Sequence, residues 1–119
     1  MSPTRGRTVS LFSYGTLRQA EVQRAAFGRL LDGRPDALPG YTLAPLPISD
    51  PEVVRISGLA VHTIARRTGD PADRIPGLVF AITHAELAAA DSYEVDAYGR
   101  VEVVLASGTA AFAYVGPDA

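Results

Sequence analysis

Two segments of the chain carry residues whose types and spacing suit chemistry on a small polar molecule. The first spans residues 11–18 and reads Leu-Phe-Ser-Tyr-Gly-Thr-Leu-Arg, an apolar run that stops at a Tyr-Gly-Thr turn before a helical pattern begins. A strand that turns into a helix leaves backbone N–H groups unpaired, and these groups attract negative charge. We expect this turn to hold a carboxylate or a small polar substrate. The alternative is an ordinary turn in which Gly15 takes a positive φ and Thr16 caps the helix.

The second segment, residues 91–100, combines three carboxylates, two tyrosines and an arginine between an expected helix and an expected strand. Apolar neighbours on both sides favour partial burial of Glu94. Burial raises the pKa of a glutamate from about 4.3 toward neutrality, which suits a general base. The alternative is a solvated acidic loop in which Glu94 is a structural carboxylate that pairs with Arg100.

Five or six strands and two helices are expected to position these segments. Strands are predicted at residues 8–13, 41–43, 53–64 (bent at Ser57-Gly58), 78–82, 101–105 and 110–115, the last two joined by a Ser107-Gly108-Thr109 hairpin turn. Helices are predicted at residues 17–27, ending at Gly28, and from 84 to about 92. Thr16 with Gln19 and Thr83 with Glu86 have the spacing of capping boxes. Residues 30–51 are dense in Gly, Pro and Asp, and residues 66–76 are expected to form a polar loop.

Strands and helices do not alternate regularly in this pattern, which argues against a doubly wound parallel sheet. The pattern favours an α+β fold: a small mixed or antiparallel β-barrel of five to six or more strands with two or so flanking helices. A chain of 119 residues suffices for one domain, which we expect over residues 8–119. Residues 1–7 are polar, lack an apolar run, and are expected to form a flexible N-terminal tail.

The composition argues against several classes of function. The chain has no cysteine, which excludes disulfides and thiolate chemistry, and its two histidines, His62 and His84, are too few for a histidine-rich metal site. A net charge of −2 without a basic stripe argues against nucleic-acid binding. No apolar run approaches the roughly 20 residues of a membrane span. We therefore expect a cytoplasmic protein without a metal, cofactor, nucleic-acid or membrane partner.

Five short motifs, in this order, resemble the gamma-glutamylcyclotransferase-like superfamily, which includes plant avirulence-induced proteins and many small bacterial proteins. They are Ser13-Tyr14-Gly15-Thr16-Leu17, Gly40-Tyr41, Pro76-Gly77-Leu78-Val79-Phe80, Leu87 through Asp91-Ser92-Tyr93-Glu94, and Tyr98-Gly99-Arg100. The resemblance covers the chain from about Val9 to Val115. It implies a compact β-barrel with flanking helices.

The resemblance also implies a reaction and a site. In that family the α-amine of a γ-glutamyl group attacks its own side-chain carbonyl, which gives 5-oxoproline and a free amine. The implied catalytic acid–base is Glu94, and the implied substrate-binding residues are Tyr14, Gly15, Thr16, Leu17, Tyr98 and Arg100. The implied partner is a small γ-glutamyl compound, with no cofactor, and the protein is expected to be a monomer or homodimer. The alternative is a non-catalytic module that binds a small metabolite on the same barrel.

Overall fold

The computed structural model describes residues 9–47, 51–58, 61–94 and 98–116 of the chain. The predicted N-terminal tail, residues 1–7, lies outside this part. The described residues form seven strands, three α-helices and one 3₁₀ turn. In chain order these are β1 (Val9–Ser13), the 3₁₀ turn η1 (Thr16–Arg18), α1 (Ala20–Phe27), β2 (Gly33–Pro39), β3 (Tyr41–Pro47), α2 (Pro51–Ser57), β4 (Val61–Arg67), β5 (Arg74–Ile82), α3 (His84–Tyr93), β6 (Gly99–Val104) and β7 (Ala110–Val115).

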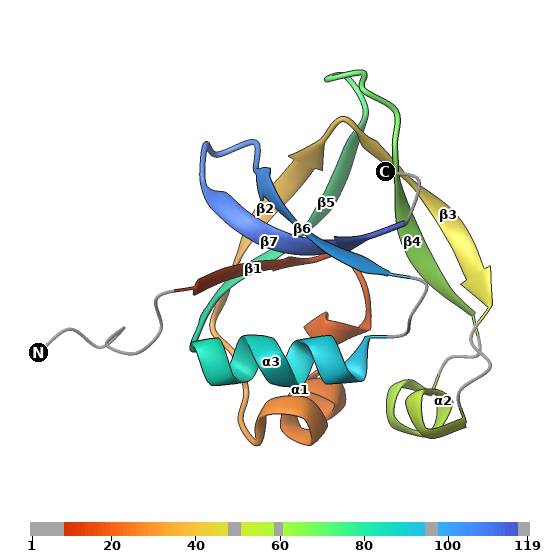
Figure 1. Ribbon diagram of the computed structural model, residues 1–119, viewed down its shortest axis with the longest axis vertical. Helices are drawn as coiled ribbons and strands as arrows, with labels where there is room; N and C mark the ends of the chain where they lie inside the picture. Colours follow the sequence, from red (N-terminus) through yellow and green to blue (C-terminus); the bar gives the residue numbers. More distant parts are fainter. Residues whose placement is uncertain (1–8, 48–50, 59–60, 95–97, 117–119) are drawn as a thin grey trace, which may run out of the picture.

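The strands lie in two sheets. The larger sheet has five strands in the order β2-β5-β1-β7-β6, and the smaller consists of β3 and β4 (Figure 1). In the larger sheet β1 runs parallel to β7, and the other neighbours are antiparallel. The fold is therefore α+β with a mixed sheet. Over the described residues this sheet ends at β2 and β6 and is not closed, so the expected barrel is not confirmed.

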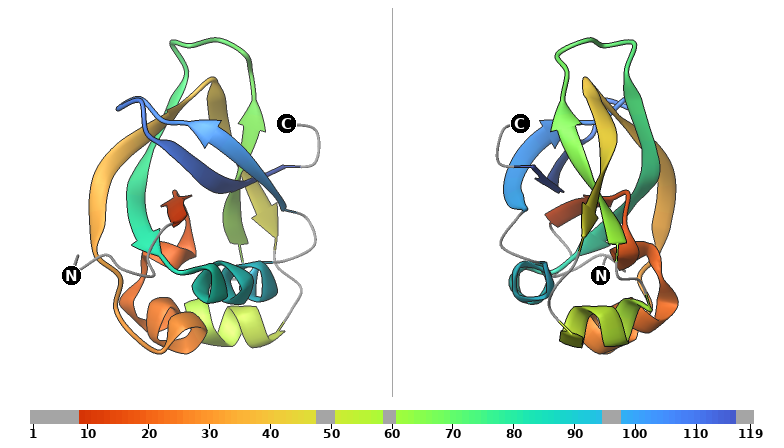
Figure 2. Two further views of the ribbon diagram at one scale, coloured as in Figure 1. Left: turned by 60° about the vertical axis from the view of Figure 1, so that its left-hand side comes forward. Right: turned by 90° about the vertical axis from the view of Figure 1, so that its right-hand side faces the viewer.

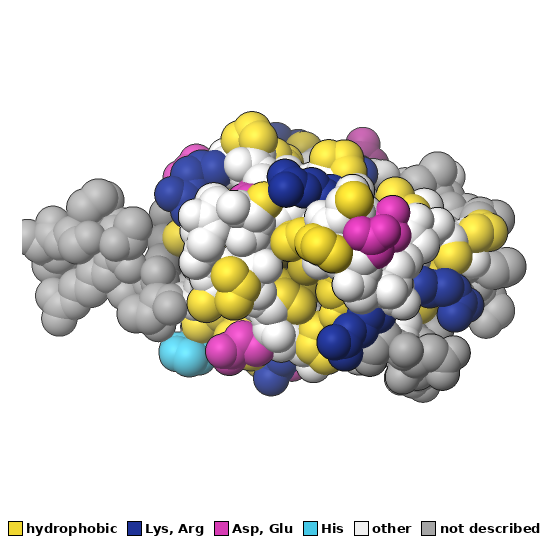
Figure 3. Space-filling model, turned by 90° about the horizontal axis from the view of Figure 1, so that it is seen from above, with side chains coloured by type: hydrophobic (Ala, Val, Ile, Leu, Met, Phe, Trp, Pro, Cys, Tyr) yellow, Lys and Arg dark blue, Asp and Glu magenta, His cyan; other side chains and the backbone are white. Residues whose placement is uncertain are grey.

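The helices gather at one end of the sheets, and the β4–β5 loop and the β6–β7 turn lie at the other end (Figures 1 and 2). α1 contacts both α2 and α3, and α3 contacts β1. On the face seen in Figure 3, arginine side chains are scattered among acidic and apolar ones rather than gathered in one patch. Within the described ranges, none of the helices has the length and apolar character to cross a membrane.

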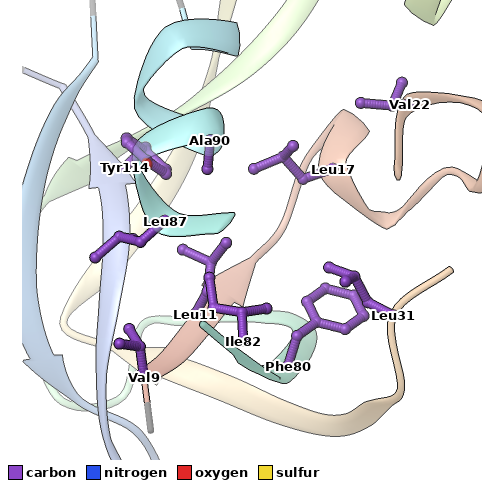
Figure 4. Packing of buried hydrophobic residues seen from close by; sticks show 10 residues of the cluster. All are labelled: Val9, Leu11, Leu17, Val22, Leu31, Phe80, Ile82, Leu87, Ala90 and Tyr114. Carbon is purple, nitrogen blue, oxygen red and sulfur yellow. The ribbon is translucent and has the colours of Figure 1, made fainter. Parts of the chain in front are cut away.

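The central strand β1 is buried on both faces of the larger sheet. Successive side chains of a strand point to opposite faces, so Leu11 and Phe12 enter different cores. Leu11 belongs to a cluster between the sheet and the helices α1 and α3, drawn in Figure 4. Phe12 belongs to a second cluster on the opposite face, which includes Ala65 of the small sheet. Burial on both faces fits the three apolar residues of β1, Val9, Leu11 and Phe12.

Local signals correctly predicted several element boundaries. α1 ends at Gly28, whose φ of 72° is left-handed. α3 begins with the predicted capping box, in which the N–H of Glu86 donates to the Thr83 hydroxyl at 3.0 Å. The last two strands form the predicted hairpin.

In the middle of the chain the prediction missed one strand and assigned part of a helix to another strand. β2 occupies a region without a predicted strand; as an edge strand paired with β5 alone, it tolerates Pro35 and Pro39. Residues 53–57, predicted as a strand, belong to helix α2. Pro51 suits the first position of that helix, and Gly58, with a φ of 74°, ends it by donating its N–H to the carbonyl of Val54.

The predicted capping box at Thr16 is also wrong. The helix begins only at Ala20, its N-cap is Gln19 without a side-chain cap bond, and residues 16–18 form the separate turn η1. The Thr16 hydroxyl lies instead 2.7 Å from the hydroxyl of Tyr93 on α3. A tertiary hydrogen bond has therefore replaced the local one.

Gly77 allows β5 to approach the end of β1 closely. A Cβ atom at this position would overlap the carbonyl oxygen of Ser13 and would lie 2.7 Å from the Phe12 ring. We expect Gly77→Ala to lower the free energy of unfolding by about 1–3 kcal/mol, because backbone and ring would have to shift. Gly99→Ala is the matched control, since a Cβ there meets no atom within 4 Å. Equal effects of both substitutions in urea unfolding would contradict this account.

Candidate active site

The two segments singled out in the sequence meet at one partly open pocket, where β1 ends. The pocket has a cavity volume of about 20 Å³ and is lined by Phe12, Ser13, Tyr14, Gly15, Thr16, Glu94, Tyr98 and Tyr114. Of the predicted site residues, Tyr14, Gly15, Thr16, Glu94 and Tyr98 are therefore together. The side chain of Leu17 is 1% exposed and belongs to the core drawn in Figure 4.

The loop of residues 14–17, which we call the site loop, is held by nearby side chains. The Ser13 hydroxyl accepts the Gly15 N–H at 3.3 Å, and Arg18 Nε donates to the Gly15 carbonyl at 3.1 Å. The amide of Gln23, buried in α1, donates to the Leu17 carbonyl at 3.0 Å. Within the described part of the chain, the N–H groups of Thr16 and Leu17 have no acceptor. They remain the donors that a strand-to-helix turn was expected to offer.

Gly15 does not take the positive φ of the alternative interpretation, because its φ is −124°. A Cβ atom at this position would meet no atom within 4 Å. The absent side chain therefore leaves space at the pocket rather than relieving backbone strain.

The hydroxyl of Tyr14 links both sheets to the site loop. It donates to the carbonyl of Tyr114 on β7 and accepts the N–H of Ala65 on β4 at 2.9 Å. Nearby, the N–H of Gly116 donates to the Ala65 carbonyl at 2.8 Å. Tyr98 makes a similar connection, because its hydroxyl donates to the Thr63 carbonyl of β4 at 2.6 Å. These rings are therefore fixed walls of the pocket whose hydroxyls are already engaged.

Glu94 follows the last turn of α3 directly, and its N–H donates to the Ala90 carbonyl at 3.0 Å. No hydrogen bond to its carboxylate comes from any described residue. Burial raises the pKa of this carboxyl from 4.5 to about 8.

Four tyrosines surround the carboxyl of Glu94: Tyr14, Tyr93, Tyr98 and Tyr114. Burial raises the pKa of each hydroxyl, and the negative charge of Glu94 raises it further in all four. The phenols therefore stay neutral at pH values where Glu94 titrates. Among the described residues that line the pocket, Glu94 is the one acidic or basic side chain.

Arg100 does not pair with Glu94 as the alternative interpretation supposed. Its guanidinium lies 2.6 Å from Oδ2 of Asp91 and 5.2 Å from the ring centre of Phe112. Arg100 is also absent from the pocket lining. Asp96, the third carboxylate of the segment, lies outside the described residues.

Two tyrosines near Glu94, Tyr114 and Tyr93, were not singled out as site residues in the sequence. Tyr114 reaches the pocket from β7, where the sequence shows only an apolar strand. Tyr93 forms hydrogen bonds with the hydroxyls of Thr16 and Ser57, although Ser57 was placed in a predicted strand. The one available signal for Tyr114 was that it is the lone tyrosine of an apolar strand. A buried phenol needs a hydrogen-bond partner, so such a residue indicates a polar contact.

Metal binding has no visible candidate in the described ranges, where no three His, Cys, Asp or Glu side chains are grouped to hold an ion. His84 is exposed at the start of α3. The pocket thus offers one carboxyl, the loop residues Gly15 and Thr16, and tyrosine rings. That set suits proton transfer on a small polar molecule.

Comparison with known proteins identifies relatives of this fold. The family model described as "Gamma-glutamyl cyclotransferase, AIG2-like" matches residues 11–119. A solution structure from Arabidopsis thaliana is 23% identical with a TM-score of 0.65, over 91% of this chain and 61% of its own. A crystal structure from Pyrococcus horikoshii is 17% identical with a TM-score of 0.61, over 92% of this chain and 78% of its own. A structure named gamma-glutamyl cyclotransferase is 14% identical with a TM-score of 0.70, over 92% of this chain and 67% of its own.

At these identities the solved structures establish a likeness of fold. The chain spans 61% of the length of the Arabidopsis protein. No curated protein sequence matches the chain.

The raised pKa of Glu94 makes stability depend on pH in a way that Glu94→Gln removes. Between pH 4.5 and about 8 the folded protein binds a proton that the unfolded chain has lost, so stability falls as the pH rises through this window. We expect Glu94→Gln to melt near the wild type at pH 4.5 and increasingly above it toward pH 8. The gain should be up to about 1.4 kcal/mol per pH unit. Thermal melts that differ by a constant amount from pH 4.5 to 9 would contradict the desolvation of this carboxyl.

Proposed function

Since the chain belongs to the gamma-glutamyl cyclotransferase, AIG2-like family, we propose that it cyclises the γ-glutamyl group of a γ-glutamyl amine or γ-glutamyl amino acid. The products are 5-oxoproline and the released amine. The observation that carries this proposal is a solitary carboxyl, Glu94, with a pKa near 8, facing the site loop across an uncharged pocket. A carboxyl tuned to this range can both accept and return a proton near neutral pH.

The reaction is intramolecular, so the enzyme mainly has to fold the substrate into an attack geometry. The substrate α-nitrogen is an ammonium and must first give a proton to the Glu94 carboxylate. The free amine then attacks the γ-carbonyl carbon and forms the lactam C–N bond, while the bond from that carbon to the leaving nitrogen breaks. Across the reaction, two protons leave the α-nitrogen and two reach the leaving nitrogen. Glu94 can carry them one at a time.

The site loop supplies the complementary half of the proposed mechanism. Thr16 lines the pocket and its N–H group has no acceptor among the described residues, so this group is the candidate donor for the substrate α-carboxylate or for the oxyanion that develops on the γ-carbonyl. The described pocket lining contains no cationic side chain that could bind negative charge on the substrate. Arg100 lies outside the lining and pairs with Asp91. We therefore assign recognition of negative charge to the backbone.

The enclosed part of the pocket is small. Its cavity volume of about 20 Å³ has room for about one water molecule and lies far below that of typical ligand pockets, about 300–1,000 Å³. A γ-glutamyl substrate would therefore lie mostly in the open side of the pocket, with its reacting group toward Glu94.

The proposal predicts turnover that depends on Glu94. Purified protein incubated with γ-glutamyl amino acids, γ-glutamyl amines and glutathione should release 5-oxoproline from at least one member of the set, as measured by mass spectrometry. Glu94→Gln should lower kcat by about 10²–10⁴-fold, because an amide neither accepts nor returns the proton. Full activity of Glu94→Gln would refute the assigned base. Binding without turnover across the set would favour a binding module instead.

The space left by Gly15 is the second test of the pocket. Gly15→Val should place methyl groups at the pocket and raise KM by about tenfold or more, while the melting temperature changes little, since a Cβ there meets no atom within 4 Å. Gly99→Ala, equally free of contacts but outside the pocket lining, is the matched control and should keep the wild-type KM. Unchanged KM for Gly15→Val would remove Gly15 from the binding site.

A further inference from the structure

We propose that Asp91 is a positioning residue, which fixes the end of α3 against β6 and β7 and so holds the Glu94 carboxyl inside the pocket. This inference rests on the proposed function for its catalytic consequence, but its geometry stands independently. Asp91 and Glu94 are three residues apart at the end of the same helix.

Each carboxylate oxygen of Asp91 is bound by a different strand. Oδ1 accepts the hydroxyl of Tyr114 on β7 at 2.6 Å, and Oδ2 accepts Nη1 of Arg100 on β6 at 2.6 Å. The Arg100 bond is exposed to solvent, so the part-buried, charge-assisted bond from Tyr114 is the stronger of the two, and the donors approach from separate strands. We call this set of three side chains the Asp91 clamp.

A second contact holds the other side of the same helical turn. The hydroxyl of Tyr93 lies 2.7 Å from the hydroxyl of Thr16 in the site loop and also bonds to Ser57 of α2. The last turn of α3 is thereby attached to strands through Asp91 and to the site loop through Tyr93. The next residue along the chain is Glu94.

Glu94 needs such a restraint because its surroundings favour movement of the carboxylate from the pocket into solvent. No described residue donates a hydrogen bond to its carboxylate, and an ionised carboxylate is more stable in water than in a desolvated pocket. The last turn of α3 carries no basic residue, and the C-terminal end of a helix disfavours negative charge. An unrestrained helix end would let the carboxylate swing toward solvent.

Tyr114 extends the clamp to the pocket wall. Its side chain lines the pocket and donates to Asp91, while its backbone carbonyl accepts the hydroxyl of Tyr14. Tyr114→Phe breaks the link to Asp91 alone, because the carbonyl that holds Tyr14 remains. This substitution also changes no charge, so its effect on Glu94 cannot arise from a lost or gained charge.

The deciding measurement is the titration of the Glu94 carboxyl carbon by NMR in ¹³C-labelled protein. The other titratable groups that face it are the phenols of Tyr14, Tyr93, Tyr98 and Tyr114, which burial keeps neutral in this range, and the clamp's own charged pair, Asp91 with Arg100. We expect a wild-type midpoint near pH 8 and a fall of at least about one pH unit in Tyr114→Phe and in Asp91→Asn. Arg100→Lys keeps a cation beside Asp91 and should stay closer to the wild type.

Asp36→Asn is the matched control. Asp36 likewise accepts a hydroxyl, that of Ser107 at 2.5 Å, but lies beside the β6–β7 turn and outside the pocket lining. Its substitution should leave the Glu94 midpoint unchanged. An unchanged midpoint in Tyr114→Phe, with dispersed amide signals that show a folded protein, would overturn the clamp. An equal fall in Asp36→Asn would also overturn it.

Kinetics separates this inference from the proposed function. If the wild type releases 5-oxoproline, Tyr114→Phe should lower kcat by at least about tenfold with KM within about twofold, because a displaced carboxyl impairs proton transfer more than binding. A rise in KM alone would contradict positioning. If the wild type is inactive on every γ-glutamyl compound, the proposed function fails, and the NMR midpoint still decides whether the clamp holds Glu94.

Discussion

The hydroxyl of Tyr14 is the interaction on which the arrangement of the site depends. It bridges β7 of the larger sheet and β4 of the smaller one, and the residue that carries it also opens the site loop. A buried phenol without partners would be costly, so its two hydrogen bonds restrict how the sheets and loop can sit together. Tyr14 is therefore part of both the pocket wall and the junction between the sheets, and a change at this residue affects both.

The buried carboxyl of Glu94 is a second constraint, and it lowers stability where the hydrogen bonds of Tyr14 raise it. The Glu94 carboxyl is desolvated and accepts no hydrogen bond from a described residue, whereas the four neighbouring tyrosine hydroxyls are all paired. An unfavourable burial of this kind is retained at functional sites while the surrounding structure stabilises it. Here the support comes from ordinary contacts: Asp91 with two strands, Tyr93 with the site loop, and a capped helix start at Thr83.

Sequence reasoning succeeded where the deciding interactions were local. Gly28 ends α1 and Glu86 completes a capping box because each acts on residues within one helical turn. It failed where distant partners decided the outcome. Thr16 forgoes its helix cap for a tyrosine 77 positions away, and Pro35 lies in a strand because β2 is an edge. The family resemblance is confirmed and had already pointed to Glu94. A lone tyrosine in an apolar strand indicates a buried polar contact for Tyr114, but no local pattern could reveal that Tyr114 lies beside Glu94.

The anchoring of the site loop has a kinetic consequence. Its side chains and carbonyls are bound to α1, α3, β4 and β7, so few of its torsions remain free to be frozen by a ligand. Preorganisation of this kind lowers the entropic cost of association. Differences between ligands would then be expressed mainly in how long each one stays bound.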